Sequence, residues 1–311
     1  MGPVTVLLVL AAAVAHAGWN FFAKRAATAA GLPFTWLNSA VSAVLLLPFA
    51  VVGVVVGGQD AVRFGWAGLL ATAASGALHT GYSLLLQRGY AVGDLSVVYP
   101  LARGIGPLVA VTASVLVFDE RPGLLGLLGA GAVVLGVLVI GSGRAPAVAG
   151  GDSGSGGSAG DSAVARAAGP RRPLGVGYGV LTGVMIAGYT LWDAHAVTAL
   201  AISPLLFNWG NNVVRVLLLA PWVAGDRAVV IDVWRQHRTA VVAVAALSSL
   251  AYGLVLFAMR LAPVSLVAPA RELSIVVSAV VAWRVLGEPR PGRRLGGALV
   301  VLLGVAALAV A

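Results

Sequence analysis

The sequence lacks cysteine entirely and has only four histidines in 311 residues. Without cysteine there can be no disulfide bond, thiol nucleophile or Cys-ligated metal, and so few histidines give no basis for a metal site. A G-x-x-x-x-G-K-[ST] phosphate loop and an H-E-x-x-H zinc motif are also missing. We therefore expect a protein that is not an enzyme and that holds no metal or cofactor.

Charge is scarce as well. Charged residues make up 10% of the chain and hydrophobic residues 59%, whereas soluble globular proteins have about 25% charged and about 45–50% apolar residues. This much apolar surface also excludes a disordered chain. The net charge of +9 is spread as single cations between apolar runs, so we expect no nucleic-acid partner. The composition indicates an integral membrane protein, with the lipid bilayer as its surroundings.

The apolar runs predict an all-α integral membrane fold. A transmembrane helix needs about 20 mostly apolar residues. The motif Ala15-His16-Ala17 resembles a signal-peptidase site, but no positive region precedes it and the apolar run continues past it, so we expect a retained first helix. Ten spans are predicted, at residues 3–23, 33–57, 66–87, 94–118, 122–141, 174–197, 203–224, 239–259, 264–285 and 292–310.

A Gly/Ser/Ala-rich stretch divides these spans into five plus five. Residues 142–173 have the composition of a flexible linker. They separate a first five-helix repeat, 1–141, from a second, 174–311.

The two halves share a pattern. Pro100 and Arg103 in span four correspond to Pro269 and Arg271 in span nine, and Glu120-Arg121-Pro122 corresponds to Glu288-Pro289. Spans one and six share Trp19-Asn20 and Trp192-Asp193. Because each half has an odd number of spans, the second copy must be inverted relative to the first. Inverted repeats are typical of secondary transporters, whose binding site lies near the membrane midplane.

These residues carry a resemblance to a known family. HAGWNFFAKRA in span one, Pro-x-x-Arg in span four and LGEPRPGRRLGGALVVLLGV at the end are similar to the drug/metabolite transporter superfamily, in its EamA-like ten-helix branch. The resemblance covers essentially the whole chain. It implies transport of a small metabolite through a central cavity built by the first four helices of each half, with the fifth helix peripheral.

The intramembrane polar residues are the candidate functional residues, because such groups usually face a cavity. Arg103 and Arg271 could grip a carboxylate or phosphate; alternatively they form a structural ion pair with Glu272. In span seven, Asn208, Asn211 or Asn212, and Arg215 share one helical face. They either line a cavity or form hydrogen bonds between helices.

Aromatic and titratable residues complete the candidates. The further substrate-binding candidates are Trp19, Asn20, Tyr99, Trp192 and Tyr252, and the alternative for tyrosines near span ends is anchoring at the membrane interface. Asp193, His16 and His79 are candidates for proton coupling; alternatively a cation neutralises Asp193 and the histidines are packing residues. The buried candidates then include three cations, Arg103, Arg215 and Arg271, and two carboxylates, Asp193 and Glu272. This net positive charge favours an anionic or zwitterionic substrate.

We therefore expect a secondary transporter of the cell membrane that works by alternating access and is driven by a gradient or by exchange. The rival hypothesis is a non-transporting scaffold or a lipid-handling subunit. Glycines at 123, 126, 129, 292, 296 and 297 predict close helix packing within the chain, a homodimer seam being the alternative.

The orientation in the membrane stays open. The loops after spans one, three, five, seven and nine hold most cations, whereas the other loops hold Arg63, Arg121 and Arg260. The positive-inside rule then places both termini outside. The family resemblance implies both termini in the cytoplasm.

Overall fold

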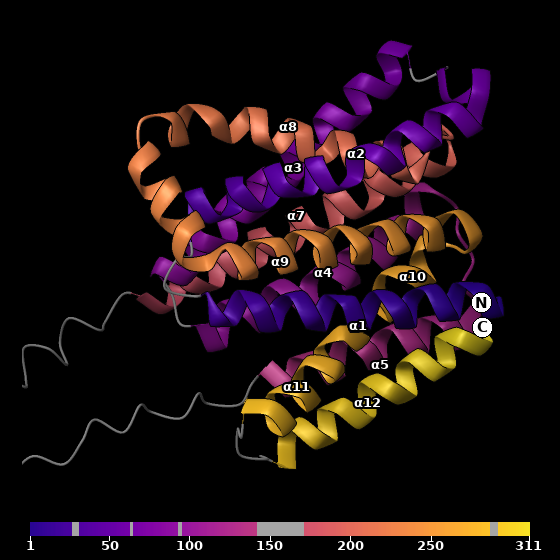
Figure 1. The fold of residues 1–311 in the computed structure, drawn as a ribbon. Helices are drawn as coiled ribbons and strands as arrows, with labels where there is room; N and C mark the ends of the chain where they lie inside the picture. The colour runs from indigo at the N-terminus through magenta and orange to yellow at the C-terminus, as the bar shows by residue number, and fades with distance from the viewer. Residues whose placement is uncertain (27–30, 63–64, 93–94, 142–170, 287–291) are drawn as a thin grey trace, which may run out of the picture.

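The computed structural model describes residues 1–26, 31–62, 65–92, 95–141, 171–286 and 292–311, and every regular element in these ranges is a helix (Figure 1). The helices are α1 (Pro3–Arg25), α2 (Leu32–Val62), α3 (Gly65–Val92), α4 (Leu95–Val117), α5 (Gly123–Gly141), α7 (Arg171–Thr198), α8 (Pro204–Ala224), α9 (Arg227–Leu261), α10 (Val264–Ala270), α11 (Leu273–Leu286) and α12 (Gly292–Val310). Six of these, α1, α2, α3, α5, α7 and α9, are long and apolar enough to cross a membrane.

The helices follow the expected ten spans, with two differences. The ninth span is broken into α10 and α11 at Arg271-Glu272, where the backbone N–H of Glu272 bonds the carbonyl of Pro269, three residues back. Pro269 lies inside α10 and cannot donate a backbone hydrogen bond itself. The eighth span begins earlier than expected, because α9 starts at Arg227 and contains a kink at His237 (φ −126°, ψ 17°).

The two halves pack against each other in matched pairs. The contact of α1 with α9 has its counterpart in the contact of α7 with α3. In the same way, the contact of α4 with α7 has its counterpart in that of α11 with α1. Helix α2 also contacts α9 as α3 contacts α8. Each pairing thus joins one half to the other and has its counterpart with the halves exchanged, which is the contact pattern of a two-fold repeat. With five spans in each half, this pattern agrees with inverted repeats.

Both chain termini lie at one end of the molecule (Figure 1). The amino group of Met1 donates to the carbonyl of Ala309 at 3.0 Å. We call this the terminal end. The opposite end, where α1, α3, α5, α8 and α11 finish, is the linker end, because α5 stops there at Gly141 and α7 begins there at Arg171.

Glycines allow α5 and α12 to touch backbone to backbone. A Cβ atom added at Gly136 would lie 2.7 Å from the carbonyl oxygen of Gly297, and one at Gly304 would lie 2.7 Å from that of Gly129. Such a contact is too close for any side chain. The expected close packing within the chain is therefore present at Gly129 and Gly297, whereas Gly296 faces open space.

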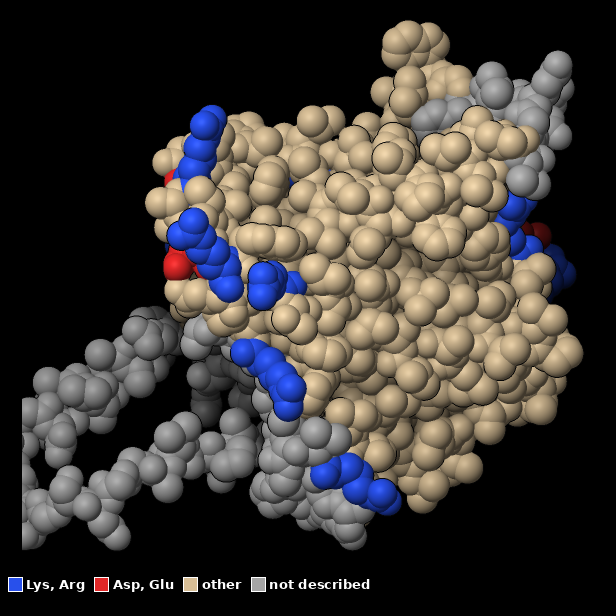
Figure 2. All heavy atoms as spheres, viewed as in Figure 1, with Lys and Arg blue, Asp and Glu red and all other residues tan. Residues whose placement is uncertain are grey.

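The outer surface is apolar around the middle and charged at the ends. Figure 2 shows a broad band without charged side chains between two charged edges. Large apolar side chains such as Leu7 (66% exposed), Leu116 (78%) and Leu303 (62%) lie on the outside. In water so much exposed apolar surface would be unfavourable, so this band is the lipid-facing belt of a multi-pass membrane protein.

Candidate functional site

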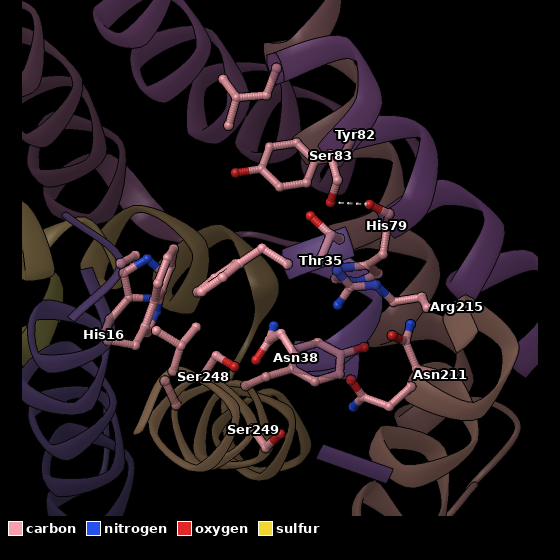
Figure 3. Close-up of a pocket in the computed structure, with 18 of the residues that line it drawn as sticks. His16, Thr35, Asn38, His79, Tyr82, Ser83, Asn211, Arg215, Ser248 and Ser249 are labelled. Carbon is pink, nitrogen blue, oxygen red and sulfur yellow. Dashed lines mark hydrogen bonds between the residues drawn. The ribbon is translucent and has the colours of Figure 1, made fainter. Parts of the chain in front are cut away.

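A cavity of about 420 Å³ lies between the two halves. Its walls come from the C-terminal parts of α1 and α3, the N-terminal part of α2, and the middle of α8 and α9, and it extends from the interior toward the linker end. Its volume is in the range of small-molecule sites. Figure 3 shows polar side chains from several helices pointing into it. The polar and aromatic lining residues include Trp19, Thr35, Asn38, His79, Tyr82, Gln87, Tyr189, Asn208, Asn211, Asn212, Arg215 and Tyr252.

Three donors converge on Asp193 of α7, which is 1% exposed. The hydroxyl of Ser75 donates to its Oδ1 at 2.5 Å, and the hydroxyl of Tyr252 donates to its Oδ2 at 2.8 Å. Nε2 of His79 lies 2.9 Å from Oδ2. Asn211 donates in turn to the Ser75 hydroxyl at 2.8 Å. The cluster therefore connects α3, α7, α8 and α9, and His79 and Tyr252 connect it to the cavity wall.

A second buried cluster surrounds Glu272, which is fully buried at the break between α10 and α11. Nη1 of Arg103 lies 3.4 Å from both carboxylate oxygens, and Nε of Arg271 lies 3.7 Å from Oε1. Nη2 of Arg103 lies 2.9 Å from Nε2 of His16. Because a guanidinium can only donate, Nε2 of His16 must be the acceptor and carries no proton. One carboxylate thus compensates two arginines.

Arg215 differs from these two arginines. It lines the cavity from α8, one turn after Asn211 and Asn212. Its Nε is buried and has no hydrogen-bond partner, and no ion pair joins it to any residue that the structure describes. In Figure 3 Arg215 and Asn211 lie on the same side of the cavity as His79. This guanidinium is therefore the cation best placed for a bound anion.

Most of the candidate residues from the sequence gather around this cavity. Ten of them line it: His16, Trp19, His79, Arg103, Asn208, Asn211, Asn212, Arg215, Tyr252 and Arg271. Asp193 lies behind the wall and contacts it through its hydrogen bonds.

Two candidates, Trp192 and Asn20, lie elsewhere. Trp192 is next to Asp193 but points from α7 toward α3, where its indole N–H donates to the carbonyl of Ala71 at 2.8 Å. Asn20 donates within its own helix to the carbonyl of His16 at 2.8 Å. The side chain of Tyr99 is outside the described part of the chain.

Sequence reasoning missed Ser75. Ser75 and His79 are four residues apart and Tyr82 is three further, so all three fall on one face of α3. That spacing was the available signal. Tyr189 stacks on His79 with ring centroids 4.1 Å apart and lies 6.0 Å from the guanidinium carbon of Arg271. It joins the two buried clusters.

Glu120 ties the halves together at the terminal end. Its carboxylate accepts hydrogen bonds from the backbone N–H groups of Val264 and Ser265, both at 2.8 Å. These are among the first N–H groups of α10, which have no partner inside the helix. All seven residues of α10 are buried. Glu120 thus binds the start of α10 at the terminal end, opposite the linker end toward which the cavity extends.

Comparison with known proteins supplies the family. The profile of the EamA-like transporter family matches residues 3–142 and 173–310. A solved structure, described as a crystal structure of a protein, superimposes with a TM-score of 0.74 at 14% identity, covering 98% of this chain and 96% of that chain. At that identity it shows the fold alone. No curated protein matches the chain. The two matched segments cover nearly all of both halves, and the chain belongs to the EamA-like transporter family.

Proposed function

We propose that this member of a transporter family carries a small anionic or zwitterionic metabolite across the cell membrane by alternating access. Membership implies secondary transport, and the family is not one of enzymes. The observation that carries the choice of substrate class is Arg215, a cavity-lining guanidinium with no ion-pair partner among the described residues. Such a guanidinium favours an anion, because it can donate charge-assisted hydrogen bonds to a carboxylate or phosphate.

The remaining charges support the same class. Arg103 and Arg271 share one carboxylate, Glu272, so their cluster keeps a net positive charge. Among the described residues Asp193 balances one cation, which leaves the cavity region positive by one when both histidines are neutral. Asn208 and Asn212 would orient the substrate next to Arg215, and Trp19 and Tyr252 would contact its apolar part. A lipid-handling subunit would instead call for an apolar lateral opening, and this polar lining does not favour it.

Proton coupling is the second element of the proposal. Asp193 and His79 form a buried pair at the cavity wall. A proton taken up by this pair would change the contact between His79 and Asp193. It would also change the contact of Asp193 with Tyr252, and that contact joins α7 to α9. His16 is less suited, because its Nε2 already accepts from Arg103. We assign coupling to Asp193 and His79.

A thermal-shift screen of the purified protein tests the substrate class. Small carboxylates, phosphate esters, amino acids, amines and neutral sugars would each be added at millimolar concentration. A ligand at 100 times its Kd stabilises a protein by about 2.7 kcal/mol. We expect stabilisers only among the anions and zwitterions, with the shift lost in Arg215→Gln and retained in Arg88→Gln, a change at an exposed arginine on α3. Stabilisation by amines alone, or an unchanged shift in Arg215→Gln, would contradict the proposal.

A further inference from the structure

Many polar side chains on the cavity wall form hydrogen bonds within the protein. Asn212 donates to the backbone carbonyl of Asn208 at 2.9 Å, and Asn208 donates to the carbonyl of Ser249 at 2.9 Å. Ser83 likewise donates to the carbonyl of His79 at 2.9 Å. These bonds hold the helices of the wall together. Polar atoms of the wall that lack such a bond are the ones that a ligand can satisfy.

Four buried side-chain atoms of the lining residues have no hydrogen-bond partner in the described part of the chain. They are Nε of Arg215, Oδ1 of Asn38, Oγ of Ser249 and Nε of Arg271. Nε of Arg271 lies 3.7 Å from the carboxylate of Glu272 and so already contacts an anion. Buried polar groups without a partner are rare in native proteins. The other three atoms therefore mark the part of the wall that a ligand completes.

Asn38 of α2 and Arg215 of α8 line the cavity at the same height. The indole N–H of Trp36 donates to the backbone carbonyl of Val216 at 3.2 Å, and this contact fixes α2 beside α8. Asn38 is two residues after Trp36, and Arg215 is one residue before Val216. With a rise of about 1.5 Å per residue, both lie within about 3 Å of this contact along the helix axes. A hydrogen-bond acceptor and a cation therefore face the same level of the cavity.

Ser249 of α9 lies deeper in the cavity and is 6% exposed. Its backbone carbonyl accepts from Asn208, which is seven residues before Arg215 on α8. Seven residues of helix span about 10 Å, so Ser249 lies about that much further toward the terminal end than Arg215. Figure 3 shows Arg215, Asn38 and Ser249 around one cavity. The unsatisfied atoms thus extend from a cation and an acceptor at one level to a hydroxyl at a deeper one.

The charges around the cavity favour hydroxyl groups over an ammonium group as the partners of these acceptors. No carboxylate is among the described residues that line the cavity. Asp193 and Glu272 lie outside this lining, where each has donors of its own. An ammonium group at Asn38 or Ser249 would thus lack a counter-charge. A hydroxyl group needs none, because it donates to the amide oxygen of Asn38 and can both donate to and accept from the Ser249 hydroxyl.

We propose that the substrate is an extended hydroxylated carboxylic acid, with its carboxylate at Arg215, one hydroxyl at Asn38 and a further hydroxyl at Ser249. This choice of substrate rests on the proposed function and narrows it. One carboxylate balances the single positive charge of the cavity region, whereas a phosphate ester carries a charge of about −1.5 to −2. Asn38 and Ser249 determine specificity, because an analogue without hydroxyls leaves their buried oxygens unpaired.

Isothermal titration calorimetry of the detergent-purified protein tests the substrate class. Gluconate carries hydroxyls along a six-carbon chain, hexanoate carries none, and norleucine and 6-aminohexanoate each carry an ammonium group. Glucose 6-phosphate carries hydroxyls and a phosphate. We expect gluconate to bind most tightly, at least about tenfold tighter than hexanoate. Equal binding of hexanoate, tighter binding of either amino acid or of glucose 6-phosphate, or no binding of gluconate overturns the proposal.

Two substitutions test the assigned residues. Asn38→Leu removes the acceptor at similar size and should weaken gluconate binding at least about tenfold without weakening hexanoate. Ser249→Ala should weaken gluconate but not the three-carbon glycerate, which is too short to reach it from Arg215. Ser39→Ala is the control, because this hydroxyl donates to the carbonyl of Thr35 within α2. It should bind gluconate like the parent. Parent affinity for gluconate in both Asn38→Leu and Ser249→Ala overturns the assignment.

Arg215→Gln separates this inference from the proposed function. If hexanoate and gluconate bind the parent equally and both are lost in Arg215→Gln, the anion site stands and the hydroxylated substrate is overturned. If Arg215→Gln binds gluconate as tightly as the parent does, the proposed function is contradicted, and the hydroxylated substrate with it.

Discussion

Arg103 of the first half and Glu272 of the second form a buried ion pair with each other. Each follows a proline by three residues, so Glu272, rather than Arg271 as the sequence comparison had it, stands at the position of Arg103 in the repeat. The nitrogen of Arg103 is 3.4 Å from the carboxylate, whose side chain is fully buried. The two prolines are Pro100 and Pro269. The repeat therefore brings opposite charges together across the contact between halves, with Arg271 beside them as a residue of the second half alone.

Removal of the carboxylate from this pair should destabilise the fold. Glu272→Gln removes the carboxylate that Arg103 and Arg271 share, and breaking a buried pair from one side costs about 3–5 kcal/mol. The double variant Arg103→Met with Glu272→Met removes both charges and should lose much less. Melting of the detergent-purified protein measures both. Asp119→Asn, at a fully exposed ion pair, is the control and should leave the melting temperature unchanged. Equal melting of Glu272→Gln and the parent would contradict the pairing.

Asp193→Asn should separate coupling from transport. The amide still fills the space between Ser75, His79 and Tyr252 but no longer carries a charge to balance a proton. We expect uptake driven by a pH gradient to fall at least about tenfold, whereas exchange of labelled for unlabelled substrate continues in proteoliposomes. Tyr252→Phe, which removes one donor, should have a smaller effect. Gradient-driven uptake at the parent rate in Asp193→Asn would refute coupling at this residue.

Glu120→Ala should weaken the contact between the halves at the start of α10. The change removes both acceptors for the first N–H groups of α10, and loss of a helix cap costs about 0.5–2 kcal/mol. Asp119→Asn is the control, because Asp119 has a positive φ (51°) that asparagine also tolerates, and its exposed carboxylate contacts only Arg121 among the described residues. Thermal unfolding should distinguish the two. A melting temperature equally lowered by both substitutions would show that the contacts of Glu120 with Val264 and Ser265 do not matter for stability.

Two adjacent glycines offer a sharp test of helix packing. A side chain at Gly297 would meet Ile140 at 2.6 Å and the backbone of Gly136 at 2.8 Å, whereas one at Gly296 meets nothing within 4 Å. Gly297→Val should therefore separate α12 from α5. Overpacking costs about 1–3 kcal/mol of stability or more, so the yield of folded protein should fall. Gly296→Val changes helix propensity equally and should be tolerated. Size-exclusion profiles of fluorescent fusions would measure the difference.

Much of the fold follows from the sequence because the membrane constrains it strongly. Each backbone polar group in hydrocarbon must bond within its own helix, so long apolar runs lead directly to helices. The break at Arg271-Glu272 was not predicted, because Pro100 at the equivalent place in α4 is compatible with a continuous helix. The difference depends on what surrounds each proline rather than on the proline itself.

The site was predicted in part for a related reason. Polar residues such as Asn208 and Arg215 stand out in an apolar helix, and they line the cavity. Trp192 shows the limit of this reasoning, because it is next to Asp193 in sequence but points 100° away around the helix, where it reaches Ala71. The pairing of Arg103 with Glu272 depends on how the two halves pack against each other. The sequence pattern of a single helix does not predict that packing.

The exchange of partners between halves has a consequence for the origin of the chain. The most extensive helix contacts, α5 with α12, α4 with α7 and α1 with α9, all join one half to the other. A lone five-helix half would leave its share of these surfaces uncovered and its polar side chains facing lipid. An ancestor encoding a single half would thus have needed two copies inserted in opposite directions. Gene fusion would fix that antiparallel pair in one polypeptide and leave each copy free to diverge, so that one copy has arginine where the other has glutamate.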